Sequence, residues 1–223
     1  MQKVLSFLQQ IRDNNNKAWF DEHKAEYQQA KLVFTEFVDK LIAGIAEFDD
    51  SVKDLTPKDC MYRFNRDTRF SPNKMPYKTH FGAFVCPKGK NSGYSGYYFH
   101  IEPSGSGYLG GHQLDTGVYC PEPNVLKSIR EEIYFNGETF DSAVRLAGDF
   151  ALEDSQALKK VPRGYPADFK YADYLKLKSP CLCKHLDDDF ILSENLLKNT
   201  IDAFKLTFEF NSFLNKAIEL AKE

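Results

Sequence analysis

The stretch Gly96-Tyr97-Tyr98-Phe99-His100-Ile101-Glu102 alternates in character from one residue to the next. In an extended strand, its apolar side chains point to one side of the backbone and its polar and ionisable side chains point to the other. The second set consists of Tyr98, His100 and Glu102. The pattern therefore predicts a strand with one face in the core and a second face that carries polar and ionisable groups.

Neighbouring stretches divide their side chains in the same way. We predict strands near residues 60–65, 80–86, 96–102 and 107–110. The apolar face is predicted to contain Tyr62, Phe64, Phe81, Ala83, Val85, Phe99 and Ile101. The opposite face gathers Arg63, His80, His100 and Glu102, and Gly82 leaves room there for a ligand. A half-exposed sheet alternates in the same way without any ligand.

Helical spacing flanks this β-rich region. The apolar residues Val4 to Ile11 recur with a helical period, and a long helix is predicted from Lys17 to about Phe48. Further helices are predicted after Pro123, ending at Asn136-Gly137, over 138–147, and from Ser193 onward; residues 159–183 are predicted to be mostly irregular. We therefore expect one α+β domain over residues 1–223. Its mainly antiparallel central sheet, about residues 60–110, is covered by the N-terminal and C-terminal helices.

The composition suits a folded, cytoplasmic protein. Of the 223 residues, 42% are hydrophobic and 14% are aromatic, which is enough for a sizeable core. No apolar run approaches the roughly 18 residues that span a bilayer, and the first ten residues do not form a signal peptide. We expect no membrane association. The oligomeric state does not follow from the sequence.

The five cysteines are an odd number and suit a reducing compartment. One cluster, Cys181-Leu-Cys183-Lys-His185, contains three potential metal ligands. Zinc sites usually pair two such motifs, and the sequence offers no second pair. We therefore expect free, mostly buried thiols, no bound metal and no cofactor.

Positive charge is concentrated in two segments of a chain whose net charge is −3. Residues 58–90 contain eight Lys and Arg against two Asp, a net charge of +6, and residues 159–178 have a net charge of +4. The first segment includes Arg63, Arg66, Asp67, Arg69, Lys74, Lys78 and His80. Arginine binds phosphate or carboxylate in two places at once, so the cluster suits a multiply charged anion. Alternatively, Asp67 pairs with Arg66 or Arg69 and only pins a loop.

The stretch Gly105-Ser-Gly107-Tyr-Leu-Gly110 matches the G-x-G-x-x-G pattern of dinucleotide sites. That mechanism needs a helix to begin at the glycines, so that its N-terminus meets the pyrophosphate. The following residues include Gly111, Gly117 and Pro121, which excludes such a helix. A glycine-rich hairpin is the better interpretation.

Several motifs occur in order along the chain. They are N-N-N-K-x-W-F-x-x-H-K (14–24), R-x-x-R-D-T-R-F-S-x-x-K-x-P-Y-K-T-H (63–80), G-Y-Y-x-H-I-E-P (96–103), P-E-P (121–123) and K-K-x-P-R-G-Y (159–165). Together they resemble domain-of-unknown-function family 2461 over nearly the whole chain. The resemblance implies a compact, mostly bacterial domain and supplies no activity. Compared with the family pattern, residues 112–116 resemble a small insertion, which argues against a site role for His112 or Asp115.

The residues are compatible with three functions. The favoured one is either an enzyme or a ligand-binding domain for a small phosphorylated or otherwise anionic molecule. Its predicted ligand-binding residues are Arg63, Arg66, Arg69, Lys74, Lys78, His80 and Tyr98, and its predicted acid–base residues are Glu102, His100 and Asp67.

The second function is nucleic-acid binding, in which the same cations contact phosphates and Tyr77, Tyr94, Tyr97 or Tyr98 stack on bases. The acidic net charge argues against it. The third is a structural or partner-binding domain in which the charged motif only holds loops together.

Overall fold

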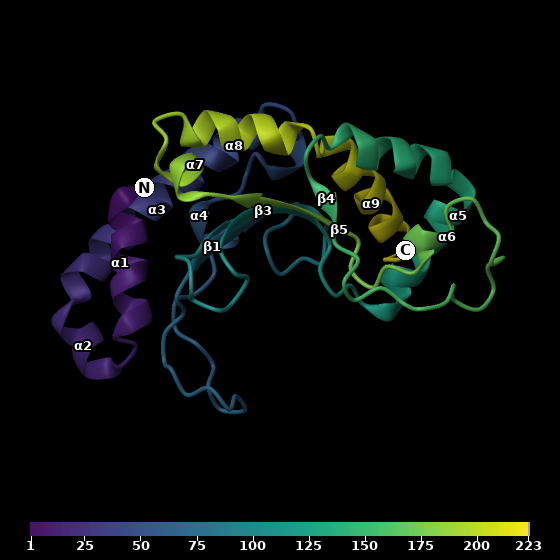
Figure 1. Ribbon diagram of the computed structural model, residues 1–223. Coiled ribbons are helices and arrows are strands. Elements are labelled where there is room, and N and C mark those ends of the chain that lie inside the picture. The colour runs from purple at the N-terminus through teal and green to yellow at the C-terminus, as the bar shows by residue number, and fades with distance from the viewer. Residues whose placement is uncertain (223) are drawn as a thin grey trace.

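The computed structural model describes residues 1–222 and has an α+β architecture with one antiparallel sheet (Figure 1). The predicted fold class is confirmed. The strands are β1 (Phe81–Val85), β2 (Gly96–Ile101), β3 (His112–Gly117), β4 (Ala151–Leu152) and β5 (Cys181–Leu186). They lie in the order β1-β2-β3-β5-β4, and each neighbouring pair is antiparallel.

The limits of the predicted sheet were partly wrong. The segment 60–65 is not a strand, because Pro57 and a capping box between Thr56 and Asp59 start the helical turn α4 (Pro57–Cys60). Isolated bridges from Met61 and Asn65 hold the following segment. Residues 107–110 belong to a loop, and the next strand is β3, where the family pattern had suggested an insertion. The first half of β5, residues 181–183, lies within the segment predicted to be irregular, so that prediction was wrong there.

The helices differ from the predicted ones mainly in where they are interrupted or kinked. The described helices are α1 (Gln2–Asp13), α2 (Lys17–Glu22), α3 (Lys24–Ala46), η1 (Asp50–Val52), α4, α5 (Pro123–Leu146), α6 (Ala172–Leu175), α7 (Asp188–Leu192), α8 (Leu196–Lys205) and α9 (Phe208–Leu220). The helix predicted from Lys17 breaks at His23, whose ring stacks on Trp19 with centroids 4.0 Å apart. Helix α5 does not stop at Asn136 but kinks there. Among the described helices, none is long and apolar enough to cross a membrane.

The core lies between the sheet and the helices drawn above it in Figure 1. Phe99 is fully buried there, and its ring centroid lies 4.7 Å from that of Phe37 in α3. Tyr97 packs against Phe204 of α8, with centroids 5.4 Å apart. Every residue of the predicted apolar face is buried except Tyr62. Tyr62 is 40% exposed, because its segment leaves the sheet instead of continuing it.

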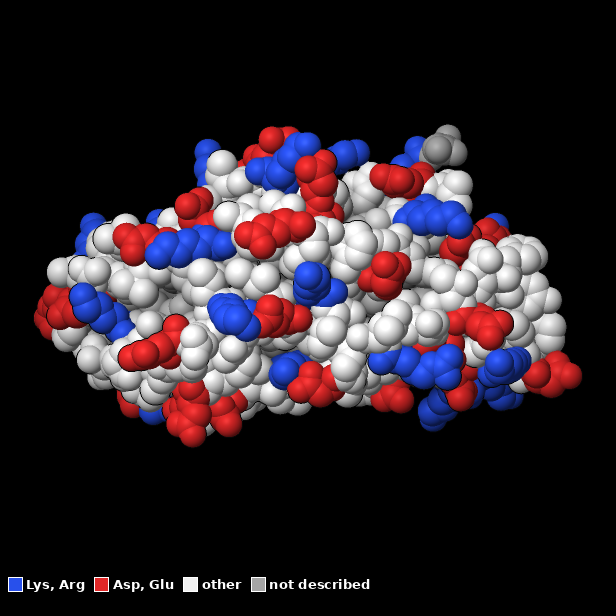
Figure 2. Space-filling view, turned by 90° about the horizontal axis from the view of Figure 1, so that it is seen from above, with Lys and Arg blue, Asp and Glu red and all other residues white. Residues whose placement is uncertain are grey.

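Helices cover one face of the sheet but not the middle of the other face. Figure 2 looks down on the helical side, where Lys and Arg are interspersed with Asp and Glu. The opposite, concave face of the sheet, called the open face below, carries no helix over its middle in Figure 1. The 61–80 loop and the segment before β5 hang at its sides. The fold therefore leaves the middle of the open face without a covering helix, between two flanking segments.

Candidate functional site

Strand register arranges the residues of the open face, most of which are polar, in two adjacent rows. The first row contains Phe84, Tyr98, Asp115 and Cys183, which are cross-strand partners from β1 to β5. The second row contains Gly82, His100, Gln113 and His185. Side chains that are direct cross-strand partners have Cβ atoms about 5 Å apart. The register therefore makes one continuous polar surface from residues that are distant in sequence.

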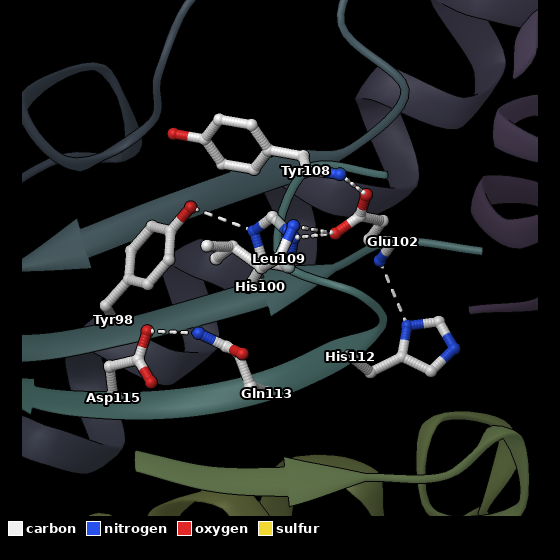
Figure 3. A network of polar contacts seen from close by, with 8 residues as sticks. All are labelled: Tyr98, His100, Glu102, Tyr108, Leu109, His112, Gln113 and Asp115. Atoms are coloured by element: carbon white, nitrogen blue, oxygen red, sulfur yellow. Dashed lines mark hydrogen bonds and ion pairs between the residues drawn. The ribbon is translucent and has the colours of Figure 1, made fainter. Parts of the chain in front are cut away.

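Tyr98, His100 and Glu102 form a hydrogen-bonded chain along β2, which we call the relay (Figure 3). His100 Nε2 lies 3.1 Å from Glu102 Oε2, and Tyr98 Oη lies 2.9 Å from His100 Nδ1. Because an ionised carboxylate only accepts hydrogen bonds, the Nε2–H of His100 donates to Glu102. In neutral His100, Nδ1 then accepts the hydroxyl proton of Tyr98.

Glu102 is completely buried and is held by the loop between β2 and β3. Its carboxylate accepts hydrogen bonds from the backbone N–H groups of Tyr108 and Leu109, both at 2.8 Å. Burial by itself raises the pKa of Glu102, but the hydrogen bonds from His100 and from these two backbone groups outweigh it and lower the pKa to about 2. Glu102 is therefore ionised at neutral pH and orients His100.

Gly82 makes room for the relay on the neighbouring strand. A Cβ atom at this position would lie 2.5 Å from Tyr98 Oη and 2.9 Å from Tyr98 Cε2. Any larger residue would displace the phenol ring from His100. The sequence had indicated that Gly82 leaves space for a ligand, whereas the structure fills that space with the end of Tyr98.

His112 supports Glu102 from β3. The backbone N–H of Glu102 donates to His112 Nδ1 at 3.0 Å, and His112 Nε2 lies 2.9 Å from Asp188 Oδ1 in α7. His112 is only 2% exposed. His112 and Asp115, for which the family pattern argued against a site role, both lie on β3, the middle strand of the sheet.

Asp115 is the second carboxyl group of the open face. Its Oδ2 accepts a hydrogen bond from Gln113 Nε2 at 2.7 Å (Figure 3). Its Oδ1 is buried and has no hydrogen-bond partner among residues 1–222. The thiol of Cys183, a weak donor, also acts on this carboxyl group. Burial raises the pKa of Asp115, and the thiol and Gln113 oppose the rise.

A cavity of about 630 Å³ lies on the open face, and Tyr98, Gln113 and Asp115 line it. His80 also lines it, although only 6% of the residue is exposed. The His80 ring stacks on Tyr108, with centroids 4.2 Å apart, and its Nδ1 is buried without a partner in the described part of the chain. Burial is the main cause that lowers the pKa of His80 to about 3, and the nearby charge of Lys78 adds to it. A second hollow of about 420 Å³ between α5 and α9 contains none of the relay residues.

Three lysines line the cavity: Lys78, Lys90 and Lys178. The ammonium of Lys78 lies 5.4 Å from the ring centroid of Tyr62. Burial, followed by repulsion from Arg63, lowers the pKa of Lys78. Lys90 donates to the backbone carbonyls of Lys58 and Asp59, so its charge is already partly satisfied.

Most of the predicted arginine motif lies outside the cavity wall. Arg69 and Asp67 form a two-point ion pair, with contacts of 2.7 and 3.0 Å. Arg66 donates to the carbonyl of Met75 at 3.2 Å, and Lys74 donates to that of Thr68 at 2.9 Å. Each of these side chains therefore makes its contacts within the 61–80 loop. Of the residues predicted from sequence, the structure brings together Lys78, His80, Tyr98, His100 and Glu102.

Three residues of the site were not predicted from the sequence. Asp115 and Gln113 lie on β3, and their alternation with the buried Leu114 was a usable signal for a strand. Lys178 precedes β5 and carries no local signal for the cavity, because only the pairing of β5 with β3 brings it there.

A family model described as "Conserved hypothetical protein (DUF2461)" matches residues 3–213, and the chain belongs to this family. No match was found among the curated proteins or among the solved structures. A role for the open face therefore has to be argued from its own geometry.

Proposed function

We propose that the protein binds a small phosphorylated or otherwise anionic molecule in the cavity of the open face. The observation that carries this proposal is that the cavity wall combines a half-buried cation, Lys78, with His80, whose buried Nδ1 has no hydrogen-bond partner within residues 1–222. Within residues 1–222, Lys78 takes part in no ion pair. Buried polar groups are ordinarily hydrogen-bonded, so an unsatisfied one at a cavity points to a missing partner.

Electrostatics support an anion at this position. Burial and the nearby Arg63 lower the pKa of Lys78, which means that its charged form is disfavoured in the empty cavity. An anion beside Lys78 reverses this effect, because an opposite charge at close range favours the ammonium. Lys178 provides a second cation at the cavity wall.

The shape and lining of the cavity support a small molecule. Its volume of about 630 Å³ lies within the range of about 300–1,000 Å³ that is usual for ligand sites. Tyr62, Tyr94, Tyr98, Tyr108 and Tyr119 contribute aromatic wall. Such side chains combine apolar contact area with a polar tip, which suits a ligand that has both an uncharged part and an anionic part.

The two alternatives receive less support. Of the four tyrosines that nucleic-acid binding would use for stacking, Tyr77, Tyr94 and Tyr97 are buried, and Tyr98 is partly exposed in the cavity. A purely structural role is supported for Arg66, Arg69 and Lys74, whose contacts stay within their own loop. It does not account for the buried Nδ1 of His80, which has no hydrogen-bond partner within residues 1–222, or for the charge of the half-buried Lys78.

The test is a thermal unfolding series with inorganic phosphate, simple phosphate esters and a short single-stranded DNA. We expect at least one phosphate compound to raise Tm, since a ligand at 100 times its Kd stabilises the native state by about 2.7 kcal/mol. In Lys78→Ala, at least ten times more ligand should be needed to give the same rise in Tm. Lys127→Ala, which removes an exposed lysine of α5, is the control. No shift with any anion, or an equal shift in Lys78→Ala, contradicts the proposal; a shift with DNA alone favours the nucleic-acid alternative.

A further inference from the structure

We propose that the open face is an acid–base catalytic centre, in which Tyr98 removes a proton from the bound molecule and Asp115 supplies one. This inference rests on the proposed function, because it takes the molecule in the cavity as the substrate. It assigns Tyr98 and Asp115 as the catalytic residues, and His100 and Glu102 as residues that act through Tyr98.

The relay gives the proton taken up by Tyr98 a defined path. Tyr98 donates its hydroxyl hydrogen to His100 Nδ1, so a lone pair of Oη is available to accept a proton from the substrate. When Oη accepts that proton, its own moves to Nδ1 and His100 becomes an imidazolium. Glu102, 3.1 Å from Nε2, stabilises this cation. A reactive hydroxyl, a base and an orienting carboxylate in hydrogen-bonded sequence is the general arrangement for activating a hydroxyl.

The resting protonation states agree with this path. Burial, and then the neighbouring phenols of Tyr108 and Tyr62, raise the pKa of Tyr98 well above its ordinary value, so the relay starts from a neutral tyrosine. The hydrogen bonds at Glu102 keep that carboxyl ionised. The two ends of the relay are therefore a neutral phenol at Tyr98 and a carboxylate at Glu102.

Asp115 is placed to act as the acid. It is the direct cross-strand partner of Tyr98, and it lines the same cavity. Gln113 donates to Oδ2, and within residues 1–222 the buried Oδ1 has no hydrogen-bond partner, the weakly donating thiol of Cys183 being the other group that acts on this carboxyl. Burial raises the pKa of Asp115 while the pKa of Glu102 is lowered. Two carboxyl groups whose environments separate their pKa values are the usual sign of separate acid and base assignments.

This pair suits proton transfer next to a carbonyl group. A C–H bond of the substrate breaks, its proton goes to Tyr98 Oη, and the hydroxyl proton of Tyr98 goes to His100 Nδ1. The electron pair of the C–H bond forms a C=C bond, and the carbonyl oxygen takes the proton of Asp115 to give an enol. Return of both protons gives the substrate or its isomer, so no oxidant or second reactant is needed. The substrate class is accordingly an anionic hydroxy-carbonyl compound, such as a sugar phosphate.

The experiment follows deuterium uptake by NMR. The protein is incubated in D₂O with ribose 5-phosphate, fructose 6-phosphate and dihydroxyacetone phosphate, and binding of each is measured in parallel by thermal shift. We expect at least one compound that binds to exchange a hydrogen next to its carbonyl group. Tyr98→Phe and Asp115→Asn should each slow the exchange at least 100-fold, in keeping with the 10²- to 10⁴-fold contribution of general acid–base groups. The matched controls, Tyr134→Phe in α5 and Asp173→Asn on the surface, should not change it.

The outcomes separate this inference from the proposed function. Compounds that bind without any exchange overturn the acid–base centre and leave anion binding intact. Exchange that persists in Tyr98→Phe or Asp115→Asn, with the variant folded as judged by circular dichroism, overturns the assignment of that residue. If none of the sugar phosphates binds but inorganic phosphate does, the substrate class is wrong. If no anion binds, both proposals fall.

Discussion

Replacing Glu102 by Gln tests the centre of the site most directly. The carboxylate is fully buried and accepts three hydrogen bonds, from His100 and from the backbone of Tyr108 and Leu109. Glutamine has nearly the same shape, but it has no charge and presents an NH₂ group to one or two of these donors. The change therefore isolates the contribution of the charged acceptor from the contribution of packing.

The pKa of Glu102 sets the magnitude of the effect. A pKa that falls from 4.5 to about 2 on folding corresponds to about 3 kcal/mol of stability at neutral pH. Because the folded-state pKa is lowered, this contribution is complete above the unfolded-state value of 4.5 and is lost as the pH falls toward 2. We expect Glu102→Gln to lower the free energy of unfolding by about 3 kcal/mol at pH 7 and by about 1.5 kcal/mol at pH 3.

The assay is urea unfolding between pH 3 and pH 7, followed by the fluorescence of the single tryptophan, Trp19. The control is Glu131→Gln, which removes an exposed ion pair to Lys127 and should change the free energy by less than about 0.5 kcal/mol. The reasoning is refuted if Glu102→Gln costs less than about 1 kcal/mol at pH 7. It is equally refuted if the difference from the parent protein does not change with pH.

Three further predictions concern the core, the relay and the thiols. Phe99→Ala should lower the free energy of unfolding by about 3–5 kcal/mol in the same urea assay, because Phe99 is fully buried against α3; a cost below about 1.5 kcal/mol contradicts the described packing. Gly82→Ala should cost about 1–3 kcal/mol, because the new methyl group overlaps Tyr98 Oη; unchanged stability shows that the phenol does not lie there. One thiol, that of the exposed Cys120, should react rapidly with a disulfide reagent at pH 8, since the other cysteines are more buried and burial raises their pKa values; rapid reaction of two or more thiols in the native protein contradicts this.

The sequence by itself determined the fold class, two of the strands and one face of the site. Alternation with a period of two is a local property, so it placed Phe81 and Phe99 in the core and His100 and Glu102 on the other face before any partner strand was known. The helical period did the same for α1, whose apolar residues are buried as predicted. Such patterns say which side of an element is apolar, and that depends only on residues nearby in the chain.

The tertiary structure decided which residues meet. Asp115 joins Tyr98 because β3 pairs with β2 in one particular register, and Lys178 reaches the cavity because β5 pairs with β3. Conversely, Arg69 lies outside the site, because its loop turns away after α4 and its guanidinium pairs with Asp67. Register and loop direction depend on contacts between residues far apart in the chain. A pattern within one segment contains no information about that pairing, so only the folded chain could bring Asp115 beside the relay.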